Sequence, residues 1–342
     1  MGSPLSLGQA ADLIDLSIQK IWLKDTPNVG MFYDKMYNVT TGVEDYYMKD
    51  SSLSGLGSAA RVVEQGTLHA EIPVQGFDQT YTQVLYGKVL AFTWHMWKFG
   101  IKKRSLQRVV SELKKACMTA REEMCAEKYD AMRLTSYSRT DDNGNYSITT
   151  TGGDALAMSS ASHTREDGGT AWSNLVSDGT TSNMNLDYPG LKASRRIGAL
   201  VKTPKGKPMS MNYDRIVVKD GTAAHFRALE ILGALKSNKI PGEFSNDGAA
   251  IGAFELVANP YLLATGDATS TTNLSSATNW HGIDKSVLGD EYGPQYYESQ
   301  PISLDEQHVV YRSKEIQYSS LLAFAYGHND PRATVHSTGA NA

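Results

Sequence analysis

Residues 55–60, Gly-Leu-Gly-Ser-Ala-Ala, match the G-x-G-x-x-A pattern of dinucleotide-binding proteins. In those proteins the pattern places backbone amides and a helix N-terminus against a pyrophosphate. The mechanism needs a buried strand before the motif and a helix that begins within it. Here polar residues 49–52 precede the motif and a strand-like alternation follows it, so the pattern favours a Gly/Ser-rich link over a nucleotide site.

A second group contains the residue types of a serine hydrolase. Ser162 and His163 lie near Asp154 and Asp167, in the segment 135–189, which is rich in Ser, Thr, Gly, Asn and Asp. Such a site would join His163 to one of the two aspartates and to a nearby serine. No G-x-S-x-G nucleophile elbow accompanies these residues. A hydrolase using the 154–187 loops, as a monomer or dimer, is therefore the hypothesis from a different class.

Metal-binding patterns are weak. The eight histidines are scattered, without an H-x-x-x-H or H-E-x-x-H pair. Cys117 and Cys125, eight residues apart on a predicted helix, are too far apart for a disulfide and too few for a zinc site. Residues 141–145 begin like a calcium loop but lack its Glu at the twelfth position, and Asn143-Gly144 is typical of a hairpin turn. We therefore expect no catalytic residues, no metal site and no cofactor.

The composition indicates a globular chain of one large or two modest domains. The 342 residues carry a net charge of −4, with 41% hydrophobic and 20% charged residues. These values exclude a collagen, a coiled-coil rod and a wholly disordered chain. We expect no membrane helix, because no apolar run approaches about 20 residues. A secreted adhesin would need an export signal, which the N-terminal residues do not resemble.

Several elements must position these residues. Apolar spacing predicts a helix over residues 7–24. Period-two alternation predicts a strand at 68–74, a turn at 75–78 and a strand at 80–94, which together would form a hairpin. A hairpin is marginal alone in water, so we expect it to lean on another surface, such as a partner subunit.

The clearest predicted element is a long helix at about 105–136. Its apolar residues keep a spacing of three to four: Leu106, Val110, Leu113, Cys117, Ala120 and Met124. The beginning of this helix and the residues before it are basic: Lys102, Lys103, Arg104, Arg108, Lys114, Lys115 and Arg121. A solvated helix face is the ordinary explanation of such a run.

After the polar segment, the pattern becomes a mixture of helices and strands. Helices are predicted at 188–201 and 222–235, and strands at 215–218, 254–257, 296–302, 308–311 and 321–326. The fold class is therefore α+β.

This order of elements resembles that of tailed-phage major capsid proteins of the HK97 type, and several stretches resemble Mu-like major head subunits. The stretches that resemble the E-loop of that group are residues 57–63, Gly66, Gly76, Thr80-Tyr81 and Tyr86-Gly87. Those that resemble its post-helix segment are residues 153–156, Ser162-His163, Gly168-Gly169 and Ser173-Asn174. Those that resemble its axial domain are residues 216–218, 228–232 and 257–262, followed by Asn279-Trp280.

The resemblance implies an HK97-like domain organisation. An N-terminal arm would span 1–38, the E-loop with flanking strands 39–97, and the peripheral domain with its spine helix 98–205. The axial domain would span 206–300, and returning strands with the C-terminal tail 301–342. No stretch resembles an N-terminal scaffolding segment or a Lys–Asn cross-linking pair.

The resemblance also implies a function without catalysis. Many copies, arranged as hexamers and pentamers, would self-assemble into the icosahedral shell of a phage head, located in the virion and assembled in the cytoplasm of the bacterial host. Expected partners are packaged double-stranded DNA, a portal, a scaffold and a cement or decoration protein, with no membrane. An encapsulin-like cargo shell is the close alternative.

Two sets of residues follow as site candidates. The interior face toward DNA would carry Lys102, Lys103, Arg104, Arg108, Lys114 and Lys115, which would contact phosphates without reading sequence. The E-loop contact between subunits would carry Arg61, Glu64, His69 and Glu71.

Overall fold

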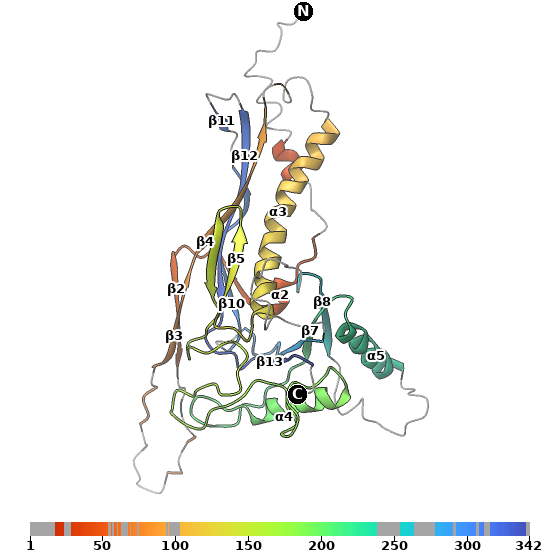
Figure 1. The fold of residues 1–342 in the computed structure, drawn as a ribbon. Coiled ribbons are helices and arrows are strands. Elements are labelled where there is room, and N and C mark those ends of the chain that lie inside the picture. The colour runs from red at the N-terminus through yellow and green to blue at the C-terminus, as the bar shows by residue number, and fades with distance from the viewer. Residues whose placement is uncertain are drawn as a thin grey trace, which may run out of the picture.

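A long helix, α3 (Lys103–Asp130), runs along the narrow part of the molecule in the computed structural model (Figure 1). The structure describes residues 18–23, 29–53, 56, 58–59, 61–62, 68, 70–73, 75–93, 95, 103–237, 254–262, 278–289, 292–305, 308–310 and 315–339. The long strands of one sheet run beside α3, and a second sheet with two helices forms a broader base.

The sequence of α3 explains its length and its buried face. Its 28 residues contain no Gly or Pro and span about 42 Å at 1.5 Å per residue. Val110, Leu113, Cys117 and Met124 are buried, as their spacing predicts. The predicted end at 136 is wrong, because residues 131–133 form a turn and the chain enters a strand at Ser136.

The sheet beside α3 is built around a 13-residue strand, β12 (Glu315–Gly327). One edge of β12 pairs with β10 (Gln295–Leu304) and β11 (His308–Val310), and the other edge with β4 (Val84–Phe92). A short strand, β1 (Asn38–Thr41), adds in parallel to β10. Alternate residues of β12, including Ile316, Tyr318, Leu322 and Phe324, are buried toward α3.

The hairpin predicted over 68–94 is wrong. Residues 75–78 belong to strand β3 (Gln75–Thr82), which pairs antiparallel with β2 (Tyr47–Leu53). β4 pairs with β12 instead of folding back on the preceding strand. Alternation identified β4 but not its partner, and pairing with β12 brings the side chains of Leu90 and Phe92 into an apolar cluster with α3. We call the antiparallel pair β2–β3, with residues 47–82, the ribbon.

A hairpin after α3 confirms the turn predicted at Asn143-Gly144. It consists of β5 (Ser136–Asp141) and β6 (Gly144–Thr149), joined by residues 142 and 143. Gly144 has a φ of +114°, which a residue with a side chain rarely adopts.

The base is a four-stranded sheet in the order β13 (Thr334–Ser337), β9 (Trp280–Ile283), β7 (Arg215–Lys219) and β8 (Glu255–Asn259). Helix α5 (Ala223–Ser237) lies in the connection between the parallel strands β7 and β8. Helix α4 (Tyr188–Leu200) begins at Asp187, whose carboxylate accepts a hydrogen bond from the backbone N–H of Gly190 at 2.8 Å. The strands and helices predicted here are confirmed within a few residues.

The N-terminal arm packs along α3 at two places. Residues 18–23 are helical, which confirms the described part of the helix predicted at 7–24, and the rest of that prediction lies outside the described residues. Ile18 and Trp22 are buried in a cluster with Val110 and Tyr318. Farther along, the short helix α2 (Tyr33–Met36) packs near the C-terminal end of α3.

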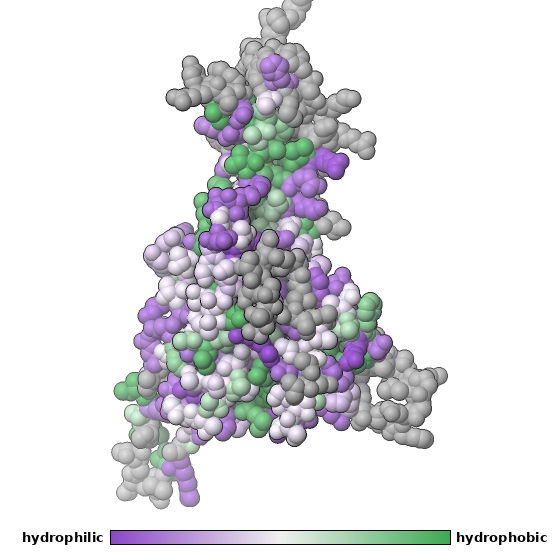
Figure 2. Space-filling model, in the orientation of Figure 1, coloured by the Kyte–Doolittle hydropathy of each residue, from purple (hydrophilic) through white to green (hydrophobic). Residues whose placement is uncertain are grey.

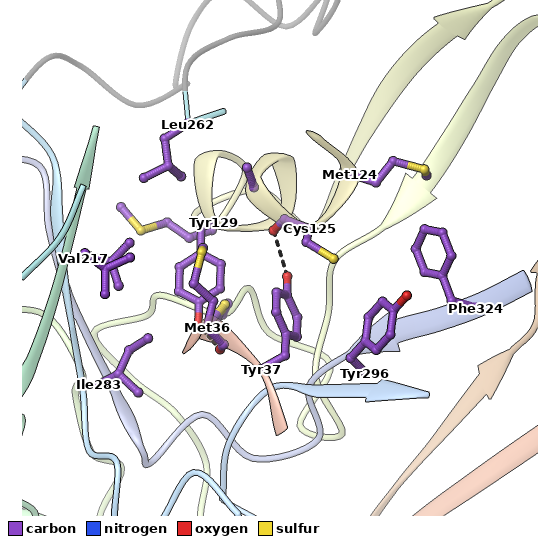
Figure 3. Packing of buried hydrophobic residues seen from close by; sticks show 14 of the residues in the cluster. Met36, Tyr37, Met124, Cys125, Tyr129, Val217, Leu262, Ile283, Tyr296 and Phe324 are labelled. Carbon is purple, nitrogen blue, oxygen red and sulfur yellow. Dashed lines mark hydrogen bonds between the residues drawn. The ribbon is translucent and has the colours of Figure 1, made fainter. Parts of the chain in front are cut away.

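Two tyrosines join α2 to α3 reciprocally. The hydroxyl of Tyr37, directly after α2, donates to the backbone carbonyl of Cys125 at 2.9 Å (Figure 3). The hydroxyl of Tyr129 on α3 donates to the carbonyl of Met36 at 2.7 Å. The two rings meet edge to face, with centroids 5.7 Å apart. All four residues belong to the largest buried cluster, so neither carbonyl can turn to water instead.

We expect Tyr37→Phe and Tyr129→Phe each to lower the free energy of unfolding by about 0.5–1.5 kcal/mol, because each removes a buried hydrogen bond. Urea denaturation of the unassembled subunit measures the change. Tyr46→Phe is the matched control, since Tyr46 is 59% exposed. A loss no larger than that of the control would contradict the reciprocal contact.

Two histidines are buried side by side in the base sheet. The Nδ1 atoms of His281 and His336 lie 3.0 Å apart, and His336 Nε2 lies 3.1 Å from the hydroxyl of Thr334. Burial lowers the pKa of His281 to about 3. Burial, and then the nearby His281, His163, His328 and Arg133, hold the pKa of His336 well below its usual value. The folded state therefore keeps these rings neutral.

Because these folded-state pKa values are depressed, the unfolded chain binds more protons once the pH falls below about 6.5. We expect the free energy of unfolding to fall between pH 6.5 and 4, by up to about 1.4 kcal/mol per pH unit for each buried histidine. His281→Asn should flatten this pH dependence, measured as the slope of stability against pH. His308→Asn, on the exposed β11, should leave the slope unchanged. Equal slopes in all three proteins would refute the assignment.

Candidate assembly interfaces

The loop of the ribbon exposes large apolar side chains. Leu53, Leu56, Val62, Leu68 and Ile72 are between 48% and 82% exposed. A concentration of exposed apolar side chains on one segment is typical of a surface that another protein covers. The ribbon stands to one side of the sheet beside α3 (Figure 1).

A second uncovered apolar surface lies on the outer face of the long sheet. On β4, Tyr86, Leu90 and Phe92 face α3, so Leu85 and Val89 face away from it and are 61% and 56% exposed. Their partners across the ladder, Ala323 and Ser319, continue this face onto β12. Figure 2 shows hydrophobic surface along the narrow part of the molecule, where α3 and the long strands run.

The ribbon is attached to the rest of the molecule, which we call the body, through buried polar side chains. We call this attachment the junction. The hydroxyl of Ser52 on β2 lies 3.0 Å from Glu166 Oε1. Asn329, directly after β12, donates from Nδ2 to the carbonyl of Phe77 on β3 at 3.1 Å. Behind Glu166, Arg332 Nη2 lies 3.6 Å from Glu166 Oε2, and Arg332 also pairs with Asp330. Both strands of the ribbon are therefore held by side chains of the body.

Two glycines allow this close approach. A Cβ atom on Gly76 of β3 would lie 2.4 Å from Ser52 Oγ and 2.7 Å from Glu166 Cγ. A Cβ atom on Gly153 would lie 2.0 Å from Asn329 Oδ1 and 2.7 Å from Phe77 Cβ. All four distances are below van der Waals contact, so any larger residue at either position would push the ribbon and the body apart.

Burial sets the protonation of the groups around this junction. It raises the pKa of Asp330 to about 6, although the Arg332 guanidinium opposes the shift. It lowers the pKa of Lys128, on the buried end of α3, to about 7. Burial, then the charge of Lys128 and then His163, hold the pKa of His328 well below its usual value. Arg332 thus pairs with both Asp330 and Glu166 at the junction, beside Lys128 and His328, whose charged forms burial disfavours.

The candidate hydrolase residues form a structural contact. His163 Nδ1 lies 2.7 Å from Asp154 Oδ2, and its Nε2 lies 3.3 Å from Asn174 Oδ1. The ring is 1% exposed and stacks on Trp172. Both ring nitrogens therefore face Asp154 and Asn174, and neither faces a serine hydroxyl.

The other residues of that hypothesis lie elsewhere. Ser162 is exposed, and Asp167 pairs with Arg165 rather than with His163. Within the described part of the chain, no group of three His, Cys, Asp or Glu side chains could hold a metal ion. None of the helices described is long and apolar enough to cross a bilayer.

The predicted DNA-facing residues divide into three groups. Arg108 and Lys115 are exposed on α3. Lys114 instead donates to the carbonyl of Trp22 at 2.9 Å and lies over its ring. Lys103 and Arg104 belong to the first turn of α3, where only the backbone is described, and Lys102 lies outside the described residues.

The predicted E-loop contacts are also divided. Arg61 is exposed. Glu71 pairs with Lys205, which follows α4, at 3.1 Å. Glu64 and His69 lie outside the described residues. Glu71, predicted to contact a neighbouring subunit, therefore pairs with a residue of its own chain.

Sequence reasoning missed the polar junction. Ser52, Glu166 and Asn329 are far apart in sequence, and each is typical of a solvated loop. A usable signal is the run of residues 328–332, mostly polar, directly after the apolar end of β12, because polar groups have to find partners where the chain is buried.

Comparisons of sequence find no relative: no family model matches the chain, and neither does any curated protein. Comparisons of structure do. The chain is similar to a structure from Gordonia phage Cozz, with a TM-score of 0.50 and 12% identity over 98% of this chain and 96% of that one. It also matches the capsid structure of cyanophage P-SCSP1u, with a TM-score of 0.49 and 10% identity, over 93% and 90% of the two chains. The capsid of Myoviridae phage XM1 gives a TM-score of 0.46 and 12% identity, over 92% of this chain and 94% of that one.

The likeness to the phage Cozz structure extends over nearly the whole of both chains, so the chain has that fold. The predicted α+β, HK97-like architecture is confirmed.

Proposed function

We propose that the chain is the structural subunit of a tailed-phage head, many copies of which close an icosahedral shell around double-stranded DNA. The observation that carries this proposal is the ribbon, which exposes apolar side chains, on a chain that has the fold of a phage structure over almost its whole length. A subunit with such a ribbon is incomplete alone, because the exposed side chains gain free energy only when another surface covers them.

The outer face of the long sheet offers that surface. Leu85 and Val89 are as exposed as the ribbon side chains, and both surfaces are extended and apolar. A ribbon laid across the sheet of the next copy would bury both at once. The contact joins two different patches, so it propagates around rings such as hexamers and pentamers.

The exposed basic residues of α3 would face the packaged DNA. Arg108 and Lys115 lie on the solvated side of the helix, where they can contact phosphates of any sequence. Lys114 supports this face indirectly, since it fixes the helix at 18–23 against α3. The net charge of −4 fits a lining that offsets phosphate charge without binding DNA tightly.

The same assignment places the chain in the virion, assembled in the cytoplasm of the bacterial host with a portal, a scaffold and a cement or decoration protein as partners. An encapsulin-like shell would enclose cargo proteins instead of a genome. The role is structural rather than catalytic, because the His163–Asp154 pair, on which a hydrolase would depend, serves to hold a loop.

We expect the chain, co-expressed with a candidate scaffold, to form closed shells or capsomer rings in size-exclusion chromatography and negative-stain microscopy. Leu68→Asp with Ile72→Asp should abolish these assemblies and leave a folded subunit, because charge on the ribbon cannot be buried against an apolar face. Leu200→Asp, at an exposed apolar site on α4, is the control. A parent chain that stays monomeric with scaffold would refute the shell.

The DNA-facing assignment has its own test. In capsomers binding double-stranded DNA, the affinity should fall with salt, and Arg108→Gln with Lys115→Gln should reduce the slope of log K against log salt by up to about 2. Fluorescence anisotropy at several salt concentrations measures this slope. Lys202→Gln with Lys207→Gln removes two exposed lysines from the base and should leave the slope nearly unchanged. The opposite ranking would place DNA on the base instead.

A further inference from the structure

We propose that Glu166 is the positioning residue that sets the direction in which the ribbon leaves the body. The inference about the ribbon concerns the single chain, and only its consequence for a shell rests on the proposed function. Glu166 lies in the loop between residues 163 and 172.

That loop is held rigidly at its base. Residues 163 and 172 exchange two backbone hydrogen bonds, of 2.8 and 3.0 Å, so the segment between them is a short closed loop. The His163 ring fixes this base through Asp154 and Asn174. Asn174 is itself fixed, because its Oδ1 accepts from the N–H of Ser160 and its Nδ2 donates to the carbonyl of Met158. Glu166 therefore projects from a defined place.

The carboxylate of Glu166 lies between the ribbon and the body. Its side chain is 5% exposed, with Oε1 toward Ser52 and Oε2 toward Arg332. Arg332 is itself 1% exposed and is held by Asp330 and by the ring faces of Trp172 and Tyr292. A buried carboxylate is costly without partners, so Glu166 favours the geometry in which Oε1 is hydrogen-bonded to Ser52 and Oε2 lies in an ion pair with Arg332.

The ribbon side of the contact is equally restricted. Ser52 is 2% exposed, and its hydroxyl also lies 3.3 Å from the carbonyl of Phe77 on the opposite strand. One serine thus contacts both strands and the carboxylate. Gly76 lies against the same atoms, with no space for a side chain. A rotation of the ribbon about its base would break the Ser52 contact or drive β3 into Glu166.

The consequence is that the free subunit presents its apolar ribbon at one fixed angle. In a shell, this angle determines where the ribbon reaches the next copy, and therefore the curvature that the contact permits. Lys205 adds a second contact farther along the ribbon at Glu71, but an ion pair between two partly exposed side chains holds direction only weakly.

The test measures the ribbon on the unassembled subunit. Spin labels at Leu68→Cys and Leu200→Cys, both exposed, report the distance between the ribbon and the base by double electron–electron resonance. The native Cys117 and Cys125 are buried, so the labels attach at the two introduced cysteines. Glu166→Gln and Ser52→Ala should broaden the distance distribution at an unchanged fold, monitored by circular dichroism. Thr80→Ala, an exposed hydroxyl on β3, is the matched control and should keep the parent distribution.

A steric variant tests the same contact without removing a charge. Gly76→Ala should shift the mean distance, because the new Cβ displaces Ser52 or Glu166. Gly233→Ala, where a Cβ would meet nothing within 4 Å, should not. Parent-like distributions in Ser52→Ala and Gly76→Ala would overturn the proposal, even if Glu166→Gln fails to fold.

The shell readout is kept separate. If the proposed function holds, Ser52→Ala subunits should form shells of mixed size under conditions in which the parent forms one size, as seen by negative-stain microscopy. Uniform shells together with a broadened ribbon would overturn the link between ribbon direction and curvature. If the parent forms no shells, the proposed function fails, while the distance measurements still decide the role of Glu166.

Discussion

The burial of the last two turns of α3 on all sides is the constraint on which the rest of the structure depends. Near its start, α3 is an ordinary amphipathic helix with Arg108, Glu112 and Lys115 in solvent. From residue 124 to residue 132 every position is buried. The helix therefore enters the place where the long sheet, the base and the N-terminal arm meet, and Tyr129 contacts both Met36 of the arm and His281 of the base.

Because these turns of α3 carry Glu127, Lys128 and Asp130 as well as apolar residues, the interior of the molecule contains polar and charged side chains. Glu127 is paired with Arg139 of the following hairpin, and Glu122 accepts the backbone N–H groups of Phe32 and Tyr33 at 3.0 and 3.1 Å. Burial raises the pKa of Glu122 to about 7, against the effect of those two hydrogen bonds. Polar contacts of this kind allow few alternative packings, since each partner left unpaired would cost free energy.

Local pattern predicted α3, β4, the β5–β6 hairpin and much of the base, but neither the strands of the ribbon nor their pairing. The spacing of Val110, Leu113 and Cys117 was sufficient for α3, and the apolar run around Val217 for the base sheet, because each signal lies within one segment. The pairing of β2 with β3 joins strands separated by more than twenty residues, and a period of two gives no information about which strand lies opposite. The junction could not be predicted from local pattern at all. Glu166 and Arg332 look like solvated loop residues, and only the fold reveals that they are buried together.

The N-terminal arm illustrates what attachment at two separated places does for a chain segment. The helix at residues 18–23 is held by Lys114 near the start of α3, and the segment at 32–37 by Glu122, Cys125 and Tyr129 near its end. When one attachment opens, the other keeps the segment at a high effective concentration near its site, so it rebinds before it can diffuse away. Two individually modest contacts thus act as a chelate, and the arm leaves α3 only when both have opened together.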